Sequence, residues 1–179
     1  MAEDVYRIVR QPAHVANAYL LGDVLLDAMT RWTGRYILRR LAGHPLSLVA
    51  LTHVHPDHQG AAAQICLARG VPLACHQADV AAMEGRAPML RNPLVQLAGR
   101  LWAGPPYPVE RILRDGDQVA GFRVVHAPGH TPGHSIFFRD ADRLAICGDL
   151  LNNVHPLTGA VRLQEPPPWV THDPAQNRR

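Results

Sequence analysis

The sequence feature that most constrains this chain is an apolar run, LSLVAL at residues 46–51, followed at once by the histidine-rich segment THVHPDHQG at residues 52–60. A continuous apolar run of this kind is typical of a β-strand that is covered on both faces. His53 and His55 alternate across Val54, so an extended backbone directs both imidazoles to the same side. The chain therefore requires a layered fold with a buried strand that ends in a polar cluster.

The histidine-rich segment has the composition and spacing of a metal-binding loop. Pro56 keeps His55 extended, and Asp57 and His58 follow where the strand turns into a helix. A single histidine here would be interpreted as a capping or core residue, but four imidazole and carboxylate groups within six positions favour metal binding. The loop offers two ligand sets, His53 with His55 and Asp57 with His58, which suits two metal ions a few ångströms apart.

Two later motifs add candidate ligands at the ends of other strands. In APGHTPGH, residues 127–134, a Pro-Gly turn raises His130 at the end of the strand-like run FRVVH, which is again a ligand position. His134 lies one turn further on and is expected to support the loop by hydrogen bonding. In CGD, Asp149 follows an apolar run, and a carboxylate at a strand end beside two cations can bridge both. His126 is still within the strand and is expected to be structural.

The rest of the chain alternates strand-like and helical patterns. Apolar runs predict strands, apolar residues at helical spacing predict helices, and turn residues between paired runs predict hairpins. Residues 78–108 mix short helical pieces with prolines and are interpreted as a helical cap inserted over one edge. These patterns predict a single α/β domain over residues 1–179, folded as a layered sandwich. The predicted strands are 5–9, 17–22, 24–28, 46–52 and 71–76, the helices are 31–44 and 61–70, and the hairpins are 118–127 and 135–149.

Composition argues against several other classes of protein. All 18 basic residues are arginines scattered along the chain, and a net charge of +3 without a basic run argues against nucleic-acid binding. No apolar run is long enough to span a membrane, and the start, MAEDVYRIVR, has no signal-peptide pattern, so we expect a cytoplasmic protein. Cys66, Cys75 and Cys147 form no CxxC pair and are interpreted as buried free thiols.

The three motifs THVHPDHQG, APGHTPGH and CGD, in this order, resemble the metallo-β-lactamase superfamily, and the resemblance runs from about residue 15 to the end. It implies an αββα four-layer sandwich with the metals at one edge of the two sheets. By motif position, it also implies the division of the ligands. The first metal would be held by His53, His55 and His130, and the second by Asp57 and His58, with Asp149 bridging the two.

The chain departs from the family pattern near its end. Family members usually supply one more histidine to the second metal, from a glycine-flanked turn, and neither His155 nor His172 has that context. Asp173 and Pro174 are typical of a helix start, as N-cap and first helical residue. We therefore expect a truncated family member whose second half is incomplete and whose second metal is held more weakly. A second sheet left uncovered could also pair with a second copy of the chain, so a homodimer is possible.

The resemblance also implies a branch and a reaction. Asp149 is similar to the glyoxalase II-like hydrolases and not to the true lactamases, and the di-iron flavoproteins typically have glutamate in place of His55. The implied activity is hydrolysis of small thioesters, lactones or related esters by hydroxide held between two divalent metal ions. Zinc is the expected metal, with iron or manganese as alternatives. Asp57 would be the catalytic residue, ligating a metal and orienting the nucleophile that attacks a small-molecule substrate.

Two other functions stay open. A mononuclear iron dioxygenase of sulfur substrates resembles the same motifs, and a catalytically weak metal-binding module would carry them as well. The sequence does not determine the substrate. Five large side chains of the cap either line a pocket over the site or pack the cap onto the core: Met83, Met89, Leu101, Trp102 and Tyr107.

Overall fold

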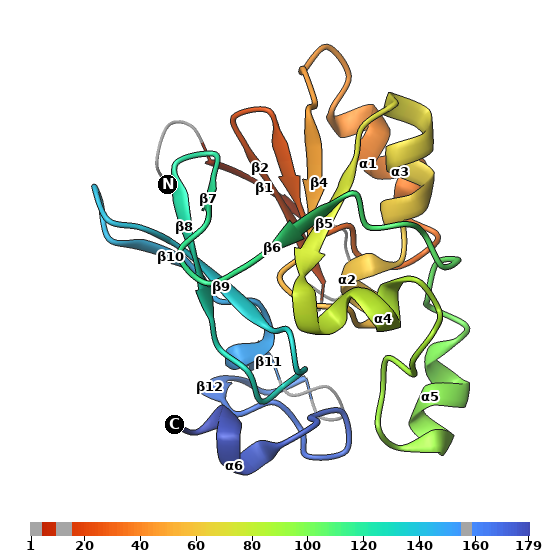
Figure 1. Ribbon diagram of the computed structural model, residues 1–179, viewed down its shortest axis with the longest axis vertical. Helices are drawn as coiled ribbons and strands as arrows, with labels where there is room; N and C mark the ends of the chain where they lie inside the picture. The colour runs from red at the N-terminus through yellow and green to blue at the C-terminus, as the bar shows by residue number, and fades with distance from the viewer. Residues whose placement is uncertain (1–4, 10–15, 155–158) are drawn as a thin grey trace.

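The computed structural model describes residues 5–9, 16–154 and 159–179. Its larger sheet has six strands in the order β1-β2-β3-β4-β5-β6 (Figure 1). The first three strands pair antiparallel, and β3 to β6 run parallel. The strands are β1 (Val5–Val9), β2 (Asn17–Leu21), β3 (Val24–Leu26), β4 (Leu48–Ala50), β5 (Leu73–His76) and β6 (Arg111–Leu113).

The second sheet is an antiparallel meander with the strand order β10-β9-β8-β7. At the turn between β7 and β8, Ala120 and Gly121 both have positive φ angles, 48° and 79°, as a two-residue hairpin of the type I′ class requires. A separate two-stranded ribbon follows. The meander strands are β7 (Gln118–Val119), β8 (Phe122–His126), β9 (Ser135–Arg139) and β10 (Leu144–Ile146), and the ribbon strands are β11 (Asn152–Val154) and β12 (Val161–Gln164).

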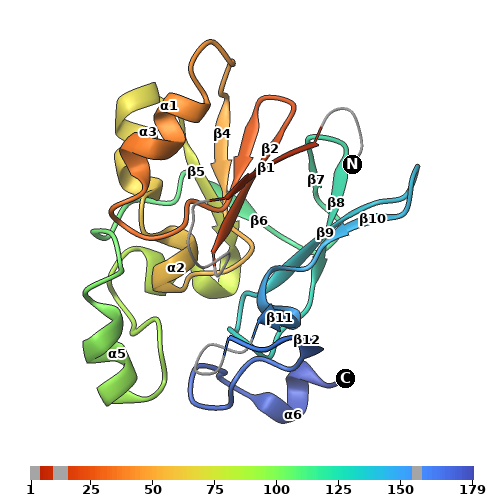
Figure 2. The ribbon, with the colours of Figure 1, turned by 180° about the vertical axis from the view of Figure 1, so that it is seen from behind.

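Helices cover one side of the pair of sheets. Figures 1 and 2 show α1 and α3 against the outer face of the six-stranded sheet, and within the described part of the chain no helix on the outer face of the meander. None of the described helices is long and apolar enough to cross a membrane. The helices are α1 (Gly34–Arg40), α2 (Pro56–Gln59), α3 (Ala62–Arg69), α4 (Val80–Met83), α5 (Pro93–Gly99) and α6 (Pro174–Asn177), with short 3-10 turns η1 (Gln77–Asp79) and η2 (Gly148–Leu150).

Two apolar cores explain why the central strands are apolar on both faces. Leu25, Val49 and Leu73 pack toward the helices in one core. Their neighbours in the same strands face the other way, where Leu48 and Ala50 pack with Phe122 and Phe137 of the meander. This alternation confirms the prediction of a strand covered on both sides and fixes its register, because a shift of one residue would exchange the two faces.

Several element boundaries differ from the prediction. The first helix begins at Gly34, later than the predicted residue 31, because the Thr33 hydroxyl bonds the Thr30 carbonyl at 2.6 Å and closes a turn before it. The second predicted helix corresponds to α3 and ends as predicted at Gly70, whose φ of 63° makes it a left-handed cap. The Asp173 carboxylate accepts from the backbone N–H of Ala175 and Gln176, which confirms the N-cap. Strands β6, β11 and β12 were not predicted.

The cap segment divides its large side chains between two environments. Met83 is fully buried in the helix-side core, and Met89 and Tyr107 pack against that core. Leu101 and Trp102 are instead 66% and 48% exposed. Packing therefore accounts for three of the five side chains. Among the cysteines, Cys66 and Cys75 are buried as expected, whereas Cys147 is half-buried.

Candidate metal centre

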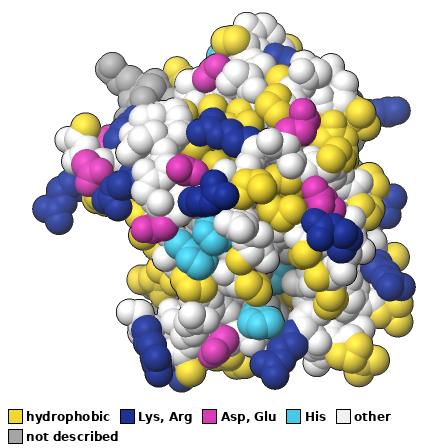
Figure 3. Space-filling view, in the orientation of Figure 1, with side chains coloured by type: hydrophobic (Ala, Val, Ile, Leu, Met, Phe, Trp, Pro, Cys, Tyr) yellow, Lys and Arg dark blue, Asp and Glu magenta, His cyan; other side chains and the backbone are white. Residues whose placement is uncertain are grey.

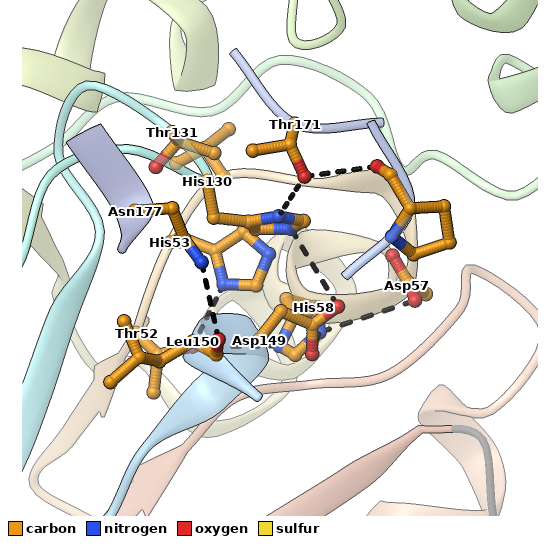
Figure 4. A network of polar contacts seen from close by, with 12 residues as sticks. Thr52, His53, Asp57, His58, His130, Thr131, Asp149, Leu150, Thr171 and Asn177 are labelled. Carbon is orange, nitrogen blue, oxygen red and sulfur yellow. Dashed lines mark hydrogen bonds and ion pairs between the residues drawn. The ribbon is translucent and has the colours of Figure 1, made fainter. Parts of the chain in front are cut away.

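The candidate ligands meet where the two sheets end at a common edge. His53 and His55 follow β4, His130 follows β8, and Asp149 lies in η2 directly after β10. Figure 4 shows the side chains of His53, His58, His130 and Asp149 pointing toward one another. Three segments that are far apart in sequence thus supply one cluster.

The cluster contains two overlapping sets of potential ligand atoms. His53, His55 and His130 form one set and His53, His58 and Asp149 the other, and within each set the ligand atoms lie within 4.8 Å of one another. Asp149 faces both sides, because its Oδ1 is 3.2 Å from His58 Nε2 and its Oδ2 is 3.6 Å from His130 Nε2. The structure thus brings the three predicted histidines together and places the Asp149 carboxylate between His58 and His130.

Asp27 and Thr52 fix the orientation of two imidazoles. Asp27 is only 2% exposed, and its Oδ2 accepts from His58 Nδ1 at 2.9 Å. The Thr52 hydroxyl donates to Asp27 at 2.9 Å, so it accepts from His53 Nδ1 at 3.1 Å. Because Nδ1 donates in both residues, Nε2 is the nitrogen of His53 and of His58 that points into the cluster.

Thr171 gives His130 the same tautomer from the C-terminal segment. Its hydroxyl donates to the Pro167 carbonyl at 3.0 Å, which leaves its oxygen to accept from His130 Nδ1 at 3.2 Å (Figure 4). The Nε2 atom of His130 is therefore a free acceptor. Thr171 lies outside the recognised motifs, and nothing local in the sequence indicated it.

The residues present fit divalent cations. The Nε2 atoms of His53 and His130 are buried and have no hydrogen-bond partner in the described part of the chain, and His58 Nε2 faces the Asp149 carboxylate at 3.2 Å. A buried polar atom without a hydrogen-bond partner costs free energy, so two of them aimed at one point indicate an occupant. Neutral imidazole nitrogens together with a carboxylate are the donor set that zinc and related metals prefer.

Burial keeps the three-histidine set neutral. Burial and the neighbouring imidazoles hold the pKa of His53 and of His55 well below 6.5. Burial also lowers the pKa of His130 to about 3. All three side chains are therefore unprotonated near neutral pH, which is the state that binds a metal.

The second set has a strongly anionic environment. Burial alone would lower the pKa of His58, but the carboxylates of Asp27 and Asp149 raise it well above 6.5. Burial would likewise raise the pKa of Asp149, yet the adjacent His58 holds it well below its usual range. Burial raises the pKa of Asp57, which lies beside the same carboxylates. Excess negative charge at this position favours a bound cation.

Comparison with known proteins agrees with this geometry. The family model described as the metallo-beta-lactamase superfamily matches residues 12–176. The chain belongs to this superfamily. Among solved structures, the superfamily fold is shared with TTHA1623 in a di-iron-bound form, which is 31% identical with a TM-score of 0.65, over 88% of this chain and 80% of that one.

Curated relatives show a similar range of identity but match over different shares of their own length. The probable metallo-hydrolase YflN of Bacillus subtilis (strain 168) is 28% identical over 89% of this chain and 72% of its own length. The hydroxyacylglutathione hydrolase of Acidiphilium cryptum (strain JF-5) is 34% identical, over 62% of this chain but only 37% of the enzyme. The probable metallo-hydrolase YybB of Bacillus subtilis (strain 168) is matched over 51% of its length.

The remaining predicted residues take different places in this superfamily site. Asp57 has a side chain 25% exposed, with Oδ2 4.0 Å from His58 Nε2, and it belongs to neither compact ligand set. The predicted role of His126 as a structural residue agrees with its ring, which stacks on His76 with centroids 3.9 Å apart. His172 is exposed, and its backbone N–H donates to the His130 carbonyl at 3.0 Å. His155 lies outside the described residues.

His134 requires a correction. It is fully buried with its ring 5.2 Å from that of His53, but neither ring nitrogen has a hydrogen-bond partner within the described ranges. The loop is supported instead by its backbone, because the His134 carbonyl accepts from Ala127 N–H at 2.9 Å. The ring packs close to Gly148, where an added Cβ would lie 2.8 Å from His134 Nε2. It therefore fills space behind the ligands.

A cavity lies beside the metal loop. Its volume is about 660 Å³, and it is lined by Pro56, which separates His55 from Asp57. Of the five large cap side chains considered in the sequence, Met89 alone is among its lining residues. Three arginines line it and no acidic residue does: Arg31, Arg86 and Arg100. On the face shown in Figure 3, by contrast, arginines are scattered and interspersed with acidic side chains.

Proposed function

We propose that this chain hydrolyses small thioesters, lactones or related esters with two divalent metal ions. The observation that carries the proposal is the arrangement of the cluster, in which His53, His55 and His130 form one set of potential ligands and His58 with the Asp149 carboxylate lies beside them as a second. A single structural metal would not require a second set. Superfamily membership and the relatives named probable metallo-hydrolases support a metal-dependent hydrolase.

Different residues of the chain would bind each of the two cations. His53, His55 and His130 would hold one cation, and His58 with Asp149 would hold the other, with Asp149 shared. When bound, the cations polarise a substrate carbonyl and lower the pKa of water toward neutrality.

Asp57 is placed to accept the proton of the attacking water. Its carboxylate is part-exposed and lies 4.0 Å from His58 Nε2. Burial raises its pKa, which makes it a better proton acceptor than an ordinary aspartate. Asp57 would therefore orient the attacking water and accept its proton.

The cavity beside Pro56 bears on the substrate class. Because three arginines line it without an acidic residue, we expect acyl groups that carry a carboxylate to be preferred. Arg86 is already paired with Glu84, so Arg31 and Arg100 are the side chains on which this preference depends. The hydroxyacylglutathione hydrolase relative supports the thioester class.

Metal content and a hydrolysis panel test the proposal together. The full chain would be stripped of metal, reloaded separately with zinc, iron(II) and manganese, and analysed for bound metal. Each form would then be offered thioesters and lactones as matched pairs with and without a carboxylate, with His53→Ala as the inactive control. About two metals per chain and hydrolysis that His53→Ala abolishes are the expected results.

Two other outcomes would assign a different function to the chain. One iron per chain with oxygen consumption on a sulfur substrate would favour the dioxygenase. The second ligand set argues against that, and the di-iron form of TTHA1623 is the reason to include iron. Tight metal binding without turnover on any ester would indicate a metal-binding module and overturn the hydrolase.

A further inference from the structure

The carboxylate of Asp79 joins the two loops that carry the three-histidine set. Asp79 ends η1, just after β5, and is only 2% exposed. Its Oδ2 accepts from Val54 N–H at 3.0 Å and from the Thr131 hydroxyl at 2.8 Å. Its Oδ1 accepts from Gly133 N–H at 2.7 Å. All three donors lie in the ligand loops.

The positions of these donors matter for the ligands. Val54 separates His53 from His55, so the bond to its N–H holds the peptide that sets the direction of both imidazoles. Thr131 follows His130 directly. One carboxylate therefore contacts the chain next to every member of the set, and it spans loops that come from different sheets.

The local alternative does not account for the Asp79 side chain. Asp79 is the N-cap residue of α4, yet its carboxylate makes no capping hydrogen bond to that helix. The bonds it makes reach 25, 52 and 54 residues along the chain. The loop also rests directly on it, since a Cβ at Gly133 would lie 2.6 Å from Asp79 Cγ. The contact thus needs a glycine at this point.

We propose that Asp79 is a positioning residue for the metal centre, setting the distance between the His53–His55 pair and His130. This inference rests on the proposed function, because it assumes that the three histidines bind a cation. An asparagine at this position keeps the volume but replaces one acceptor oxygen by an NH₂ group. That group would face a hydrogen-bond donor, so one of the two loops loses its anchor.

The test measures metal binding rather than activity. Metal-free full-length protein would be titrated with cobalt(II) and with zinc in competition with a chromophoric chelator, and the visible bands of the cobalt form would report the ligand geometry. Asp79→Asn should weaken the tighter site about tenfold or more, as expected when groups that orient ligands are changed, and should shift the cobalt bands. Asp117→Asn is the matched control, because its carboxylate accepts from Arg114 N–H at 2.8 Å away from the centre and is expected to stay within about twofold.

The outcomes separate this inference from the function on which it rests. If the wild-type chain binds neither metal, the metal centre itself is wrong. If the wild type binds and Asp79→Asn shows the same affinity and the same cobalt spectrum, Asp79 is only a fold residue and the inference is overturned, whatever happens to the melting temperature.

A second pair of variants covers the case in which Asp79→Asn does not fold. Thr131→Val removes one donor without changing the size of the side chain, and Thr131→Ser keeps the hydroxyl. Thr131→Val should weaken cobalt binding about fivefold, in line with the net contribution of one typical hydrogen bond, and Thr131→Ser should bind like the wild type. Wild-type affinity in Thr131→Val would overturn the inference as well.

Discussion

At the scale of single residues, the histidines of the centre are oriented by side chains that accept hydrogen bonds from their Nδ1–H groups. Asp27 accepts from His58, Thr52 accepts from His53, and Thr171 accepts from His130. Each acceptor forces the other nitrogen, Nε2, to be the one that faces the cluster. The chemistry of the site therefore depends on residues that would never ligate a metal themselves.

Replacing Thr171 by valine tests this dependence directly. Without the hydroxyl, the Nδ1 atom of His130 loses its 3.2 Å partner, and the ring can adopt the wrong tautomer or rotate. Zinc affinity, measured by chelator competition, should fall about tenfold. Thr171→Ser should restore it, and Ser47→Ala, which removes an exposed hydroxyl, should have no effect. Unchanged affinity in Thr171→Val would show that the tautomer is fixed by something else.

The two ligand sets predict different metal contents for neighbouring histidine variants. His53 Nε2 offers a single lone pair, so His53 and His55 are expected to bind the same cation, at the three-histidine set. His53→Ala and His55→Ala should therefore each lose the metal at that set and keep the one beside His58 and Asp149, as counted by elemental analysis after dialysis. His134→Ala should retain both, because that ring packs behind the ligands. Equal metal loss in all three variants would show that the ligand sets are misassigned.

At the scale of elements, β5 and β8 are joined at their ends by a pair of histidines. The rings of His76 and His126 stack with an interplanar angle of 15°, and His76 is only 8% exposed. Burial first, and then His126, lowers the pKa of His76 to about 4, although the carboxylates of Asp115 and Asp117 act in the opposite direction. The contact between the two sheets therefore favours an unprotonated His76.

This contact should make the fold sensitive to acid. An unfolded histidine has a pKa of about 6.5. Below that pH, His76 binds a proton in the unfolded chain but stays unprotonated in the folded chain. The contribution of His76 to the free energy of unfolding is therefore complete above about pH 6.5 and is lost as the pH falls toward about 4. The fall in melting temperature between pH 7 and pH 5, measured by calorimetry with chelator present, should be smaller for His76→Gln than for the wild type. The exposed His44→Gln is the control, and a fall as large as in the wild type would contradict the prediction for His76.

At the scale of the whole molecule, the metal centre lies across the junction of the two sheets. The six-stranded sheet contributes the loop after β4, and the meander contributes the loops after β8 and β10. The C-terminal segment closes over the same loops, since Asp173 N–H donates to the Gly129 carbonyl at 2.8 Å and Asn177 Nδ2 donates to the Leu150 carbonyl at 3.3 Å (Figure 4). A bound cation would therefore link the loops of both sheets at one point.

Metal removal should accordingly destabilise the entire domain. A ligand present at a thousand times its Kd adds about 4 kcal/mol to the free energy of unfolding, which corresponds to about 10 °C in melting temperature for a chain of this length. EDTA should lower the melting temperature of the wild type by about that amount, and added zinc should restore it. The EDTA-induced shift should be smaller in His130→Ala, which loses a ligand of the three-histidine set. A wild type insensitive to EDTA would exclude a tightly bound metal.

The sequence alone was enough to single out the candidate ligands that the structure brings together, because each depends on a local rule. His53 and His55 share a side by strand periodicity, His130 follows a Pro-Gly turn, and Asp149 ends an apolar run. The doubly covered central strand and the paired hairpins are also local patterns, so the layered α/β fold followed from them. The superfamily resemblance drawn from these motifs is confirmed by the family match.

Only the tertiary structure revealed the residues that orient those candidate ligands. Asp27 reaches His58 across 31 positions, Thr171 reaches His130 across 41, and Asp79 reaches Gly133 across 54. A hydrogen bond over such a separation leaves no period or spacing in the sequence, because the fold alone brings the two groups together. The same reason explains why the His134 ring has no hydrogen bond: its surroundings are set by how closely η2 packs against it, which no local pattern encodes.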